Sequence, residues 1–89
     1  MSELETVVRA TVLEIAEITS PDRTSVEAGD DLRDDLGFAS LDLAQLAAAL
    51  EMKLKVDPFR RNVAVTAVRT VGDLCRVYGE AVEAAAEGN

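Results

Sequence analysis

The sequence of 89 residues predicts an all-α domain, a small antiparallel four-helix bundle with three main helices and a short third helix. In three separate stretches, apolar residues recur at steps of three and four, which is the spacing of one face of a helix. Turn residues, namely Pro21, Gly37 and Pro58, separate these stretches. No pair of alternating apolar runs suggests a strand hairpin, so helices packed on helices are the expected architecture.

The first helix is expected from Leu4 to Ile18. Ser2 and Glu5 have the spacing of a capping box, in which two side chains satisfy backbone N–H groups at a helix start. The helix should end near Thr19, because Pro21 disfavours helical geometry in the residue before it. The apolar stripe that should face the core consists of Leu4, Val7, Val8, Val12, Ile15 and Ile18.

Residues 20–37 form a polar stretch rich in turn residues, which we interpret as a long loop. Only Val26, Leu32 and Leu36 are expected to dock on the core. Loops longer than about 12–15 residues in compact domains are usually functional or disordered, so a working site is expected at the far end of this one. The aspartates do not have the ligand spacing of a calcium-binding EF-hand loop, and no metal site is expected there.

The second helix is expected from Ser40 to Leu54, ending before Asp57 and Pro58. Its alanines favour helix and allow a neighbouring helix to approach closely. A short third helix is expected between Arg61 and Ala67, although the β-branched residues there also suit an extended chain. The residues of the second helix expected to face inward are Leu43, Leu46, Ala47, Leu50 and Leu54.

The last helix should begin after Thr70, which stands three residues before Asp73 in a variant of the capping box. Residues 85–89 are expected to be a frayed tail. One domain therefore spans residues 1–89, with an ordered core from about residue 3 to residue 85. The apolar face of this helix consists of Val71, Leu74, Cys75, Tyr78, Val82 and Ala85.

Cysteine and histidine usage excludes several classes of site. Cys75 is the single cysteine, so the chain forms no internal disulfide, as is usual in a reducing compartment. We expect it to be a buried structural thiol. The chain contains no histidine, which rules out Ser-His and Cys-His mechanisms within it. A small core adds to the case against an enzyme.

The formal charge of −8 lies entirely in the first half of the chain, where residues 1–42 contain 11 acidic and 3 basic residues. An acidic surface repels nucleic acid and anionic membranes and attracts proteins with basic patches. We therefore expect protein partners, and neither nucleic acid nor a membrane. No stretch approaches the ~20 apolar residues of a membrane span and no signal peptide is apparent, so a cytoplasmic location is expected.

Ser40 stands where the turn at Gly37 becomes the second helix. A serine at this place can accept a hydrogen bond from an unpaired backbone N–H, which stabilises a helix by about 1 kcal/mol. A phosphate on the same hydroxyl would also be stabilised, by about 0.3–1 kcal/mol, through the helix dipole. The local pattern favours the capping role and leaves the second one open.

Two segments carry a family resemblance, LGFASLDL at residues 36–43 and TVGDL at residues 70–74. With the helices between and around them, they resemble a discrete acyl carrier protein from about residue 4 to residue 85. The resemblance implies that a phosphopantetheinyl transferase moves 4′-phosphopantetheine from coenzyme A onto Ser40. It further implies a monomeric, non-catalytic carrier that holds acyl groups as thioesters for enzymes such as a ketosynthase or an acyltransferase.

The sequence departs from the family at Ala39, where an aspartate usually precedes the serine, and at the cations Arg60 and Arg61. The second helix is also less acidic than usual. Partner contact is therefore expected to be more apolar, with charge steering left to the loop aspartates, Asp30 and Asp31 among them. The residues assigned to partner recognition are Asp34, Asp35, Leu41, Asp42, Ala44, Gln45, Ala48 and Met52. Those assigned to an acyl-chain lining are Leu46, Leu50, Val63 and Val65.

Two alternatives stay open at this point. A peptidyl carrier of nonribosomal synthesis shares the architecture, but it usually has paired glycines before the serine, and only Gly37 is present here. An unmodified helical interaction module, in which Ser40 is only a cap, belongs to a different class. Within the acyl carriers, polyketide, fatty acid and other specialised pathways remain open.

Overall fold

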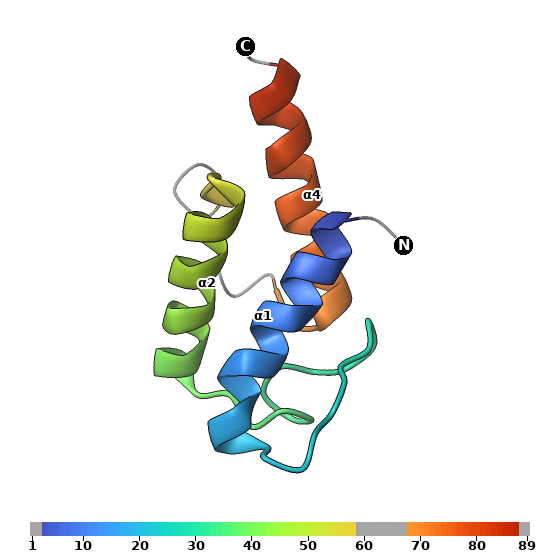
Figure 1. Ribbon diagram of the computed structural model, residues 1–89, viewed down its shortest axis with the longest axis vertical. Helices are drawn as coiled ribbons and strands as arrows, with labels where there is room; N and C mark the ends of the chain where they lie inside the picture. Colours follow the sequence, from blue (N-terminus) through green and yellow to red (C-terminus); the bar gives the residue numbers. More distant parts are fainter. Residues whose placement is uncertain (1–2, 59–67, 88–89) are drawn as a thin grey trace.

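A computed structural model describes residues 3–58 and 68–87 of the chain. It contains three helices, α1 (Glu3–Thr19), α2 (Ser40–Leu54) and α4 (Val71–Glu87). α2 and α4 both run in the direction opposite to α1 and pack against it (Figure 1). The three predicted main helices are therefore confirmed. The short helix expected at residues 61–67 lies outside the described residues, and so does Ser2 of the first capping box.

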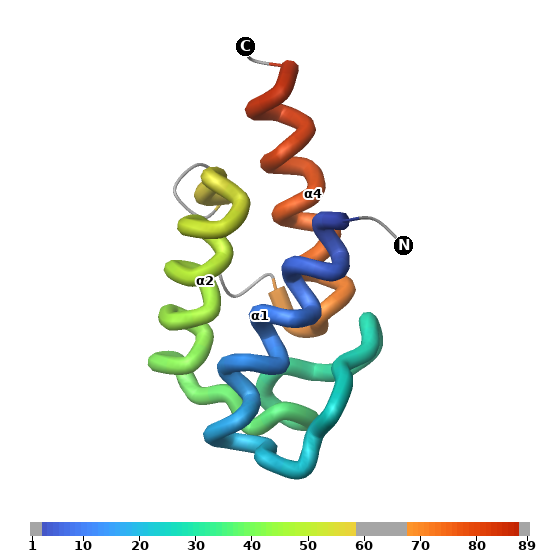
Figure 2. The backbone as a smooth tube through the Cα atoms, viewed as in Figure 1, coloured from blue at the N-terminus to red at the C-terminus, as the bar shows by residue number. Residues whose placement is uncertain are grey.

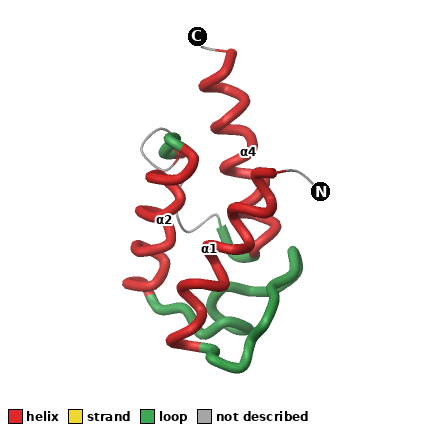
Figure 3. Tube along the Cα trace, viewed as in Figure 1, coloured by secondary structure: helices red, strands yellow, loops and turns green. Residues whose placement is uncertain are grey.

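The remainder of the described chain is loop, without a strand (Figure 3). Residues 20–39 run beneath the helices and join the end of α1 to the start of α2 (Figure 2). None of the helices in residues 3–58 and 68–87 has the length and apolar character that crossing a membrane requires.

One core joins the three helices to the loop. The three loop residues predicted to dock, Val26, Leu32 and Leu36, are all buried, and the sequence analysis missed a fourth, Phe38. α1 contributes Val8, Val12 and Ala16, together with the buried polar residue Thr11, whose hydroxyl donates to the Val7 carbonyl at 2.7 Å. The residues buried from α2 and α4 are Leu46, Leu50, Val71, Leu74, Val77 and Tyr78.

Ile18 corrects the predicted stripe of α1, because its side chain is 84% exposed. Successive helical residues turn by about 100°, so Ile18 points well away from Ala16, which faces the core. The last turn instead contacts the loop through Thr19, whose hydroxyl donates to the Leu36 carbonyl at 2.7 Å. The three- and four-residue spacing placed Ile18 in the stripe, but the core does not extend to it.

α4 continues as a helix to Glu87, whereas the sequence analysis expected fraying from Ala85. Alanine and glutamate are strong helix formers, and residues 83–87 consist only of these two types. This last part of α4 extends beyond α1 and α2 at the end of the molecule opposite the loop (Figure 1).

Backbone hydrogen bonds attach the loop to the start of α4. The N–H groups of Val71 and Gly72 donate to the carbonyls of Asp30 and Ala28, at 3.1 and 2.8 Å. The Leu32 N–H donates to the Arg69 carbonyl at 2.9 Å. A Cβ atom at Gly72 would lie only 3.1 Å from the Ala28 oxygen, so a residue with a side chain would be crowded at this position. We call these contacts between residues 28–32 and 69–72 the loop–α4 junction.

Candidate functional site

The turn that precedes α2 is held from two sides. Gly37 has φ of +74°, a left-handed conformation that favours glycine. The hydroxyls of Thr19 and Ser20 both donate to the carbonyl of Leu36, at 2.7 and 2.9 Å. The Phe38 N–H donates to the Leu32 carbonyl at 2.9 Å, and the Phe38 ring is buried. The start of α2 is thereby fixed to both α1 and the loop.

Ser40 is the first residue of α2, and Ala39 is the N-cap. The capping contact comes from Asp42, whose carboxylate accepts the backbone N–H of Ala39 at 2.8 Å. No hydrogen bond caps the helix through a side chain of the N-cap residue. The capping role that the local pattern favoured for Ser40 is therefore wrong, and Asp42, at the third helical position, makes the capping contact with the N–H of Ala39.

The backbone N–H groups at the start of α4 have hydrogen-bond acceptors, whereas those at the start of α2 have none among the described residues. At α4, Val71, Gly72 and Asp73 each donate, to Asp30, to Ala28 and to the Thr70 hydroxyl, the last at 3.1 Å. At α2, the N–H groups of residues 40–42 have no hydrogen-bond partner within the described part of the chain. A helix start with free N–H groups carries a partial positive charge and stabilises a nearby anion.

The Ser40 hydroxyl fits a phosphate ester. The residue is exposed, and its hydroxyl has no hydrogen-bond partner among residues 3–58 and 68–87. It belongs to the same helix start as the free N–H groups of α2, and a helix start of this kind stabilises a phosphate bound there. The donor set of the site thus suits a covalently attached phosphodiester.

α2 presents one apolar face to solvent and another to the core. Leu41 and Met52 are 70% and 74% exposed. Ala44, Gln45 and Ala48 are also exposed, and Asp42 is half-buried. On the opposite side, Leu46 and Leu50 are fully buried. Leu46 and Leu50 belong to the predicted acyl-chain lining. Its other two members, Val63 and Val65, lie outside the described residues.

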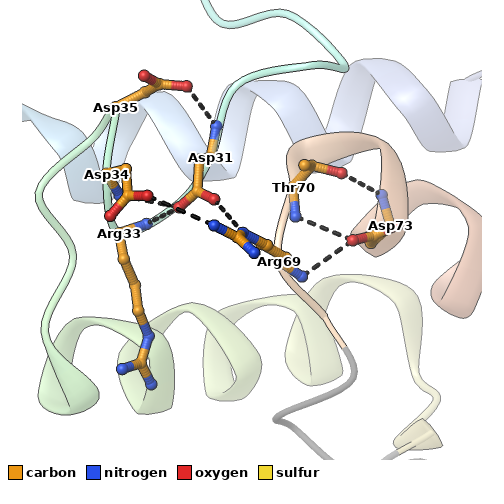
Figure 4. A network of polar contacts seen from close by, with 7 residues as sticks. All are labelled: Asp31, Arg33, Asp34, Asp35, Arg69, Thr70 and Asp73. Carbon is orange, nitrogen blue, oxygen red and sulfur yellow. Dashed lines mark hydrogen bonds and ion pairs between the residues drawn. The ribbon is translucent and has the colours of Figure 1, made fainter.

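The loop aspartates make internal contacts that the sequence analysis did not anticipate. Asp30 pairs with Arg23 at 2.7 Å. Asp31 pairs with Arg69 at 2.6 Å, and Asp34 lies 3.5 Å from the same guanidinium (Figure 4). Much of the charge of Asp30 and Asp31 is thus matched within the protein. Asp34 and Asp35 remain exposed.

Asp31 organises the turn that follows it. Its carboxylate accepts the N–H groups of Asp34 and Arg33, at 2.8 and 2.9 Å. The N–H of Asp31 in turn donates to Asp35 at 2.7 Å. The hydrogen bond from Asp34, followed by that from Arg69, lowers the pKa of the Asp31 carboxyl from its usual value.

The predicted capping box at the start of α4 is confirmed. The Asp73 N–H donates to the Thr70 hydroxyl at 3.1 Å, and the Thr70 N–H donates to the Asp73 carboxylate at 3.0 Å (Figure 4). The carboxylate also accepts the N–H of Arg69 at 3.0 Å. These backbone hydrogen bonds, that from Arg69 first, lower the pKa of Asp73.

Cys75 is a free, half-buried thiol on α4. Burial raises its pKa above the usual value, which keeps the thiol protonated and unreactive at neutral pH. Within residues 3–58 and 68–87, no group of three or more acidic, cysteine or histidine side chains is placed to hold a metal ion.

Comparison with known protein families gives one match. The profile described as "Phosphopantetheine attachment site" matches residues 6–78. This range contains most of α1, all of α2 with Ser40, and the first half of α4. Comparisons with curated proteins and with solved structures found no match.

Proposed function

Because the chain belongs to the phosphopantetheine-attachment family over residues 6–78, we propose that it is an acyl carrier protein whose 4′-phosphopantetheine is attached to Ser40. Membership of this family makes the chain a carrier with a covalent 4′-phosphopantetheine group. The observation that supports Ser40 as the attachment residue is its place at the start of α2, exposed and beside free N–H groups. Its exposure leaves the hydroxyl open to a modifying enzyme.

Attachment would proceed by phosphoryl transfer to the Ser40 hydroxyl. The Ser40 oxygen forms a bond to the phosphorus that carries the pantetheine of coenzyme A. The bond from that phosphorus to the adjacent phosphate breaks, and adenosine 3′,5′-bisphosphate leaves. The chain contains no histidine, and we assign the base that takes the serine proton to the transferase. The free N–H groups of α2 stabilise the phosphodiester that results.

The bound group supplies a terminal thiol, which holds acyl groups as thioesters. In this proposal the protein itself performs no catalysis. It holds the attachment point on a rigid turn, because Gly37, Phe38 and the Thr19 and Ser20 hydroxyls fix the start of α2. We propose polyketide, fatty acid or related specialised biosynthesis as the setting.

The exposed face of α2 is the proposed contact for the enzymes that act on the acyl group, such as a ketosynthase or an acyltransferase. Leu41 and Met52 supply exposed apolar area, and the smaller Ala44 and Ala48 lie between them on the same helix. Gln45 adds a polar contact. Asp34, Asp35 and Asp42 provide negative charge near Ser40, which suits enzymes with basic residues around the entrance to the active site.

We propose that an acyl chain, when it folds back onto the protein, packs against Leu46 and Leu50. Both side chains belong to the core between α1 and α2. The chain would therefore have to displace core contacts as it enters. Comparison of NMR spectra of the acylated and unacylated carrier tests this, since unchanged methyl resonances of Leu46 and Leu50 would contradict it. Val63 and Val65 complete the lining that we propose.

The attachment site is tested by incubating the purified protein with coenzyme A and a broad-specificity phosphopantetheinyl transferase, followed by intact mass measurement. We expect the wild-type mass to rise by one phosphopantetheine group and the mass of Ser40→Ala to stay unchanged. Ser25→Ala, which alters another exposed serine in the loop, is the matched control and should be modified like the wild type. No mass gain with several transferases would instead favour an unmodified interaction module.

A further inference from the structure

An exposed isoleucine at the end of α1 has no role in the fold. Ile18 is 84% exposed, more than Leu41 or Met52, although residues earlier in the same helix are completely buried. Single exposed apolar residues are common on protein surfaces and need no explanation. The position of Ile18 relative to Ser40 distinguishes it from such a residue.

Ile18 lies at the end of the molecule that holds Ser40. The next residue, Thr19, donates to the Leu36 carbonyl at 2.7 Å, and a Cβ at Gly37 would lie 3.7 Å from the Thr19 Cβ. Ser40 follows Gly37 by three residues, so their Cα atoms are at most about 11 Å apart. The end of α1 and the start of α2 also lie at the same, lower end of the molecule in Figure 1.

Ile18 also lies on the flank of α1 that contacts α2. Thr11, Glu14 and Ile18 are spaced by three and four residues, which places them along one side of the helix. The Lys53 ammonium of α2 contacts the first two, at 3.0 Å from the Thr11 hydroxyl and 3.1 Å from the Glu14 carboxylate. Ile18 continues this flank at the end near the first turn of α2. Leu41, 70% exposed, belongs to that turn.

The surroundings of Ile18 are acidic. Glu17 and Asp22 are exposed close to it in the chain, and the turn before α2 exposes Asp34 and Asp35 together with one cation, Arg33. The whole net charge of −8 lies in residues 1–42, which include all of these groups. Arg23, the cation closest to Ile18 in the sequence, is paired with Asp30. An apolar contact inside an acidic surface fits a partner with an apolar patch and basic residues around it.

We propose that Ile18 is a docking contact for the phosphopantetheinyl transferase, and that it acts with Leu41 from the neighbouring helix. The inference rests on the proposed function. Enzymes that act on the acyl group meet the far end of a long arm, whereas the transferase must bring its active site to the Ser40 oxygen itself. The transferase is therefore the partner whose surface has to cover the residues around Ser40, including the end of α1.

The test is the initial rate of modification at several carrier concentrations, measured with coenzyme A and a broad-specificity transferase. Ile18→Ser should lower kcat/KM about tenfold, mainly by raising KM, because a truncated contact weakens docking and leaves the chemistry at Ser40 intact. Ile18→Leu keeps the apolar area and should retain most of the wild-type value. Ala84→Ser is the control, since Ala84 is exposed and belongs to the last part of α4, at the end of the molecule opposite the loop.

The possible outcomes separate this inference from the proposed function. A wild-type protein that is modified at the same rate as Ile18→Ser would overturn the docking contact and leave Ser40 as the attachment site. An equal loss in Ala84→Ser would also overturn it, because the effect would then not be local to the surroundings of Ser40. Failure of the wild-type protein to gain mass would overturn both. Unchanged thermal melting of Ile18→Ser, expected for so exposed a residue, excludes misfolding as the cause.

Discussion

At the start of α2, the capping carboxylate and the exposed hydroxyl belong to different residues. Asp42 accepts the N–H of Ala39, and the Ser40 hydroxyl makes no hydrogen bond with the described residues. Ala39, with a methyl side chain, could not cap the helix itself. Because Asp42 makes the capping contact, the Ser40 hydroxyl is not needed for the fold. A substituent on its oxygen therefore breaks no contact within the described residues.

Because the cap and the hydroxyl belong to different residues, alanine substitutions at Ser40 and Asp42 should have different effects on stability. Ser40→Ala should change the free energy of unfolding by less than about 0.5 kcal/mol, because alanine is the best helix former and no hydrogen bond is lost. Asp42→Ala should lower it by about 1 kcal/mol, since the Ala39 N–H loses its acceptor. Urea denaturation of the apo protein measures both.

Asp42→Asn is the control for this comparison. The amide oxygen of asparagine can still accept the Ala39 N–H, so most of the stability should remain. A loss at Ser40→Ala as large as that at Asp42→Ala would contradict the assignment of the cap.

The turn between the loop and α2 depends on the conformation of Gly37. Gly37→Ala should lower the free energy of unfolding by about 1–2 kcal/mol, because φ of +74° brings a Cβ close to the following carbonyl. Gly29→Ala is the matched control, as nothing lies within 4 Å of its added Cβ and its φ is not positive. The midpoints of denaturation should therefore differ clearly between the two variants, and equal midpoints would refute the role given to the turn.

At the level of whole elements, the sequence predicted the helices well and the loop contacts only in part. Apolar spacing and turn residues located α1, α2 and α4, and the Thr70–Asp73 capping box was predicted from its spacing alone. The docking of Val26, Leu32 and Leu36 was also predicted. These features follow from local chemistry, which a single stretch of sequence contains.

The loop–α4 junction could not be predicted, because backbone groups form it and they are the same in every residue. Gly72 is the one residue type in the junction that its close backbone approach explains. A single glycine does not identify which residue, about 40 positions away, lies next to it. The pairing of Arg69 with Asp31 was missed for a related reason, since the chain offers 17 acidic residues as partners. At the site, the start of the second helix at Ser40 was predicted, whereas the exposure of Ile18 depended on where the core ends.

Acid should destabilise the whole molecule through two carboxylates, Asp31 in the loop–α4 junction and Asp73 directly after it. Hydrogen bonds lower the pKa of both Asp31 and Asp73 in the folded protein. As the pH falls, these groups are therefore protonated in the unfolded chain before they are protonated in the folded protein. Their contribution to stability is full above about pH 4 and is lost as the pH falls through their lowered pKa values. Thermal melts from pH 6 to pH 2 should show this loss.

Substitution isolates the contribution of these two groups from general acid effects. Asp31→Asn and Asp73→Asn should be less stable than the wild type at pH 6, and the difference should shrink toward pH 2. Asp22→Asn, which changes an exposed aspartate of the loop, should follow the wild-type profile. Differences that stay constant with pH would contradict the electrostatic explanation.

Ionisation of the buried Tyr78 side chain can be used to test whether the core excludes water. It is the only tyrosine, and its side chain is 1% exposed. Burial, followed by the charges of Asp57 and Glu51, raises the pKa of Tyr78 to about 12. In the folded protein, tyrosinate absorbance should therefore rise near pH 12, and in the denatured chain near pH 10. The folded state binds more protons between these values, so stability should fall as the pH rises from 10 to 12.

The chain has no tryptophan, so the absorbance change belongs to this single group. A folded protein that ionises Tyr78 near pH 10 would show that the core admits water at this position. Circular dichroism recorded at each pH separates ionisation of the folded state from unfolding.

The loop–α4 junction divides the chain into a frame and an insert. The Leu32 N–H donates to the Arg69 carbonyl, and the segment between these two residues, which we call the insert, contains all of α2 with Ser40. The frame consists of α1, the first part of the loop and α4, and its contacts do not require a fixed length of the enclosed segment. Doubling the length of a closed flexible loop costs only about 0.6 kcal/mol. Residues added between the end of α2 and Arg69 would thus leave the backbone contacts of the loop–α4 junction unchanged, because both of its partners lie outside that interval.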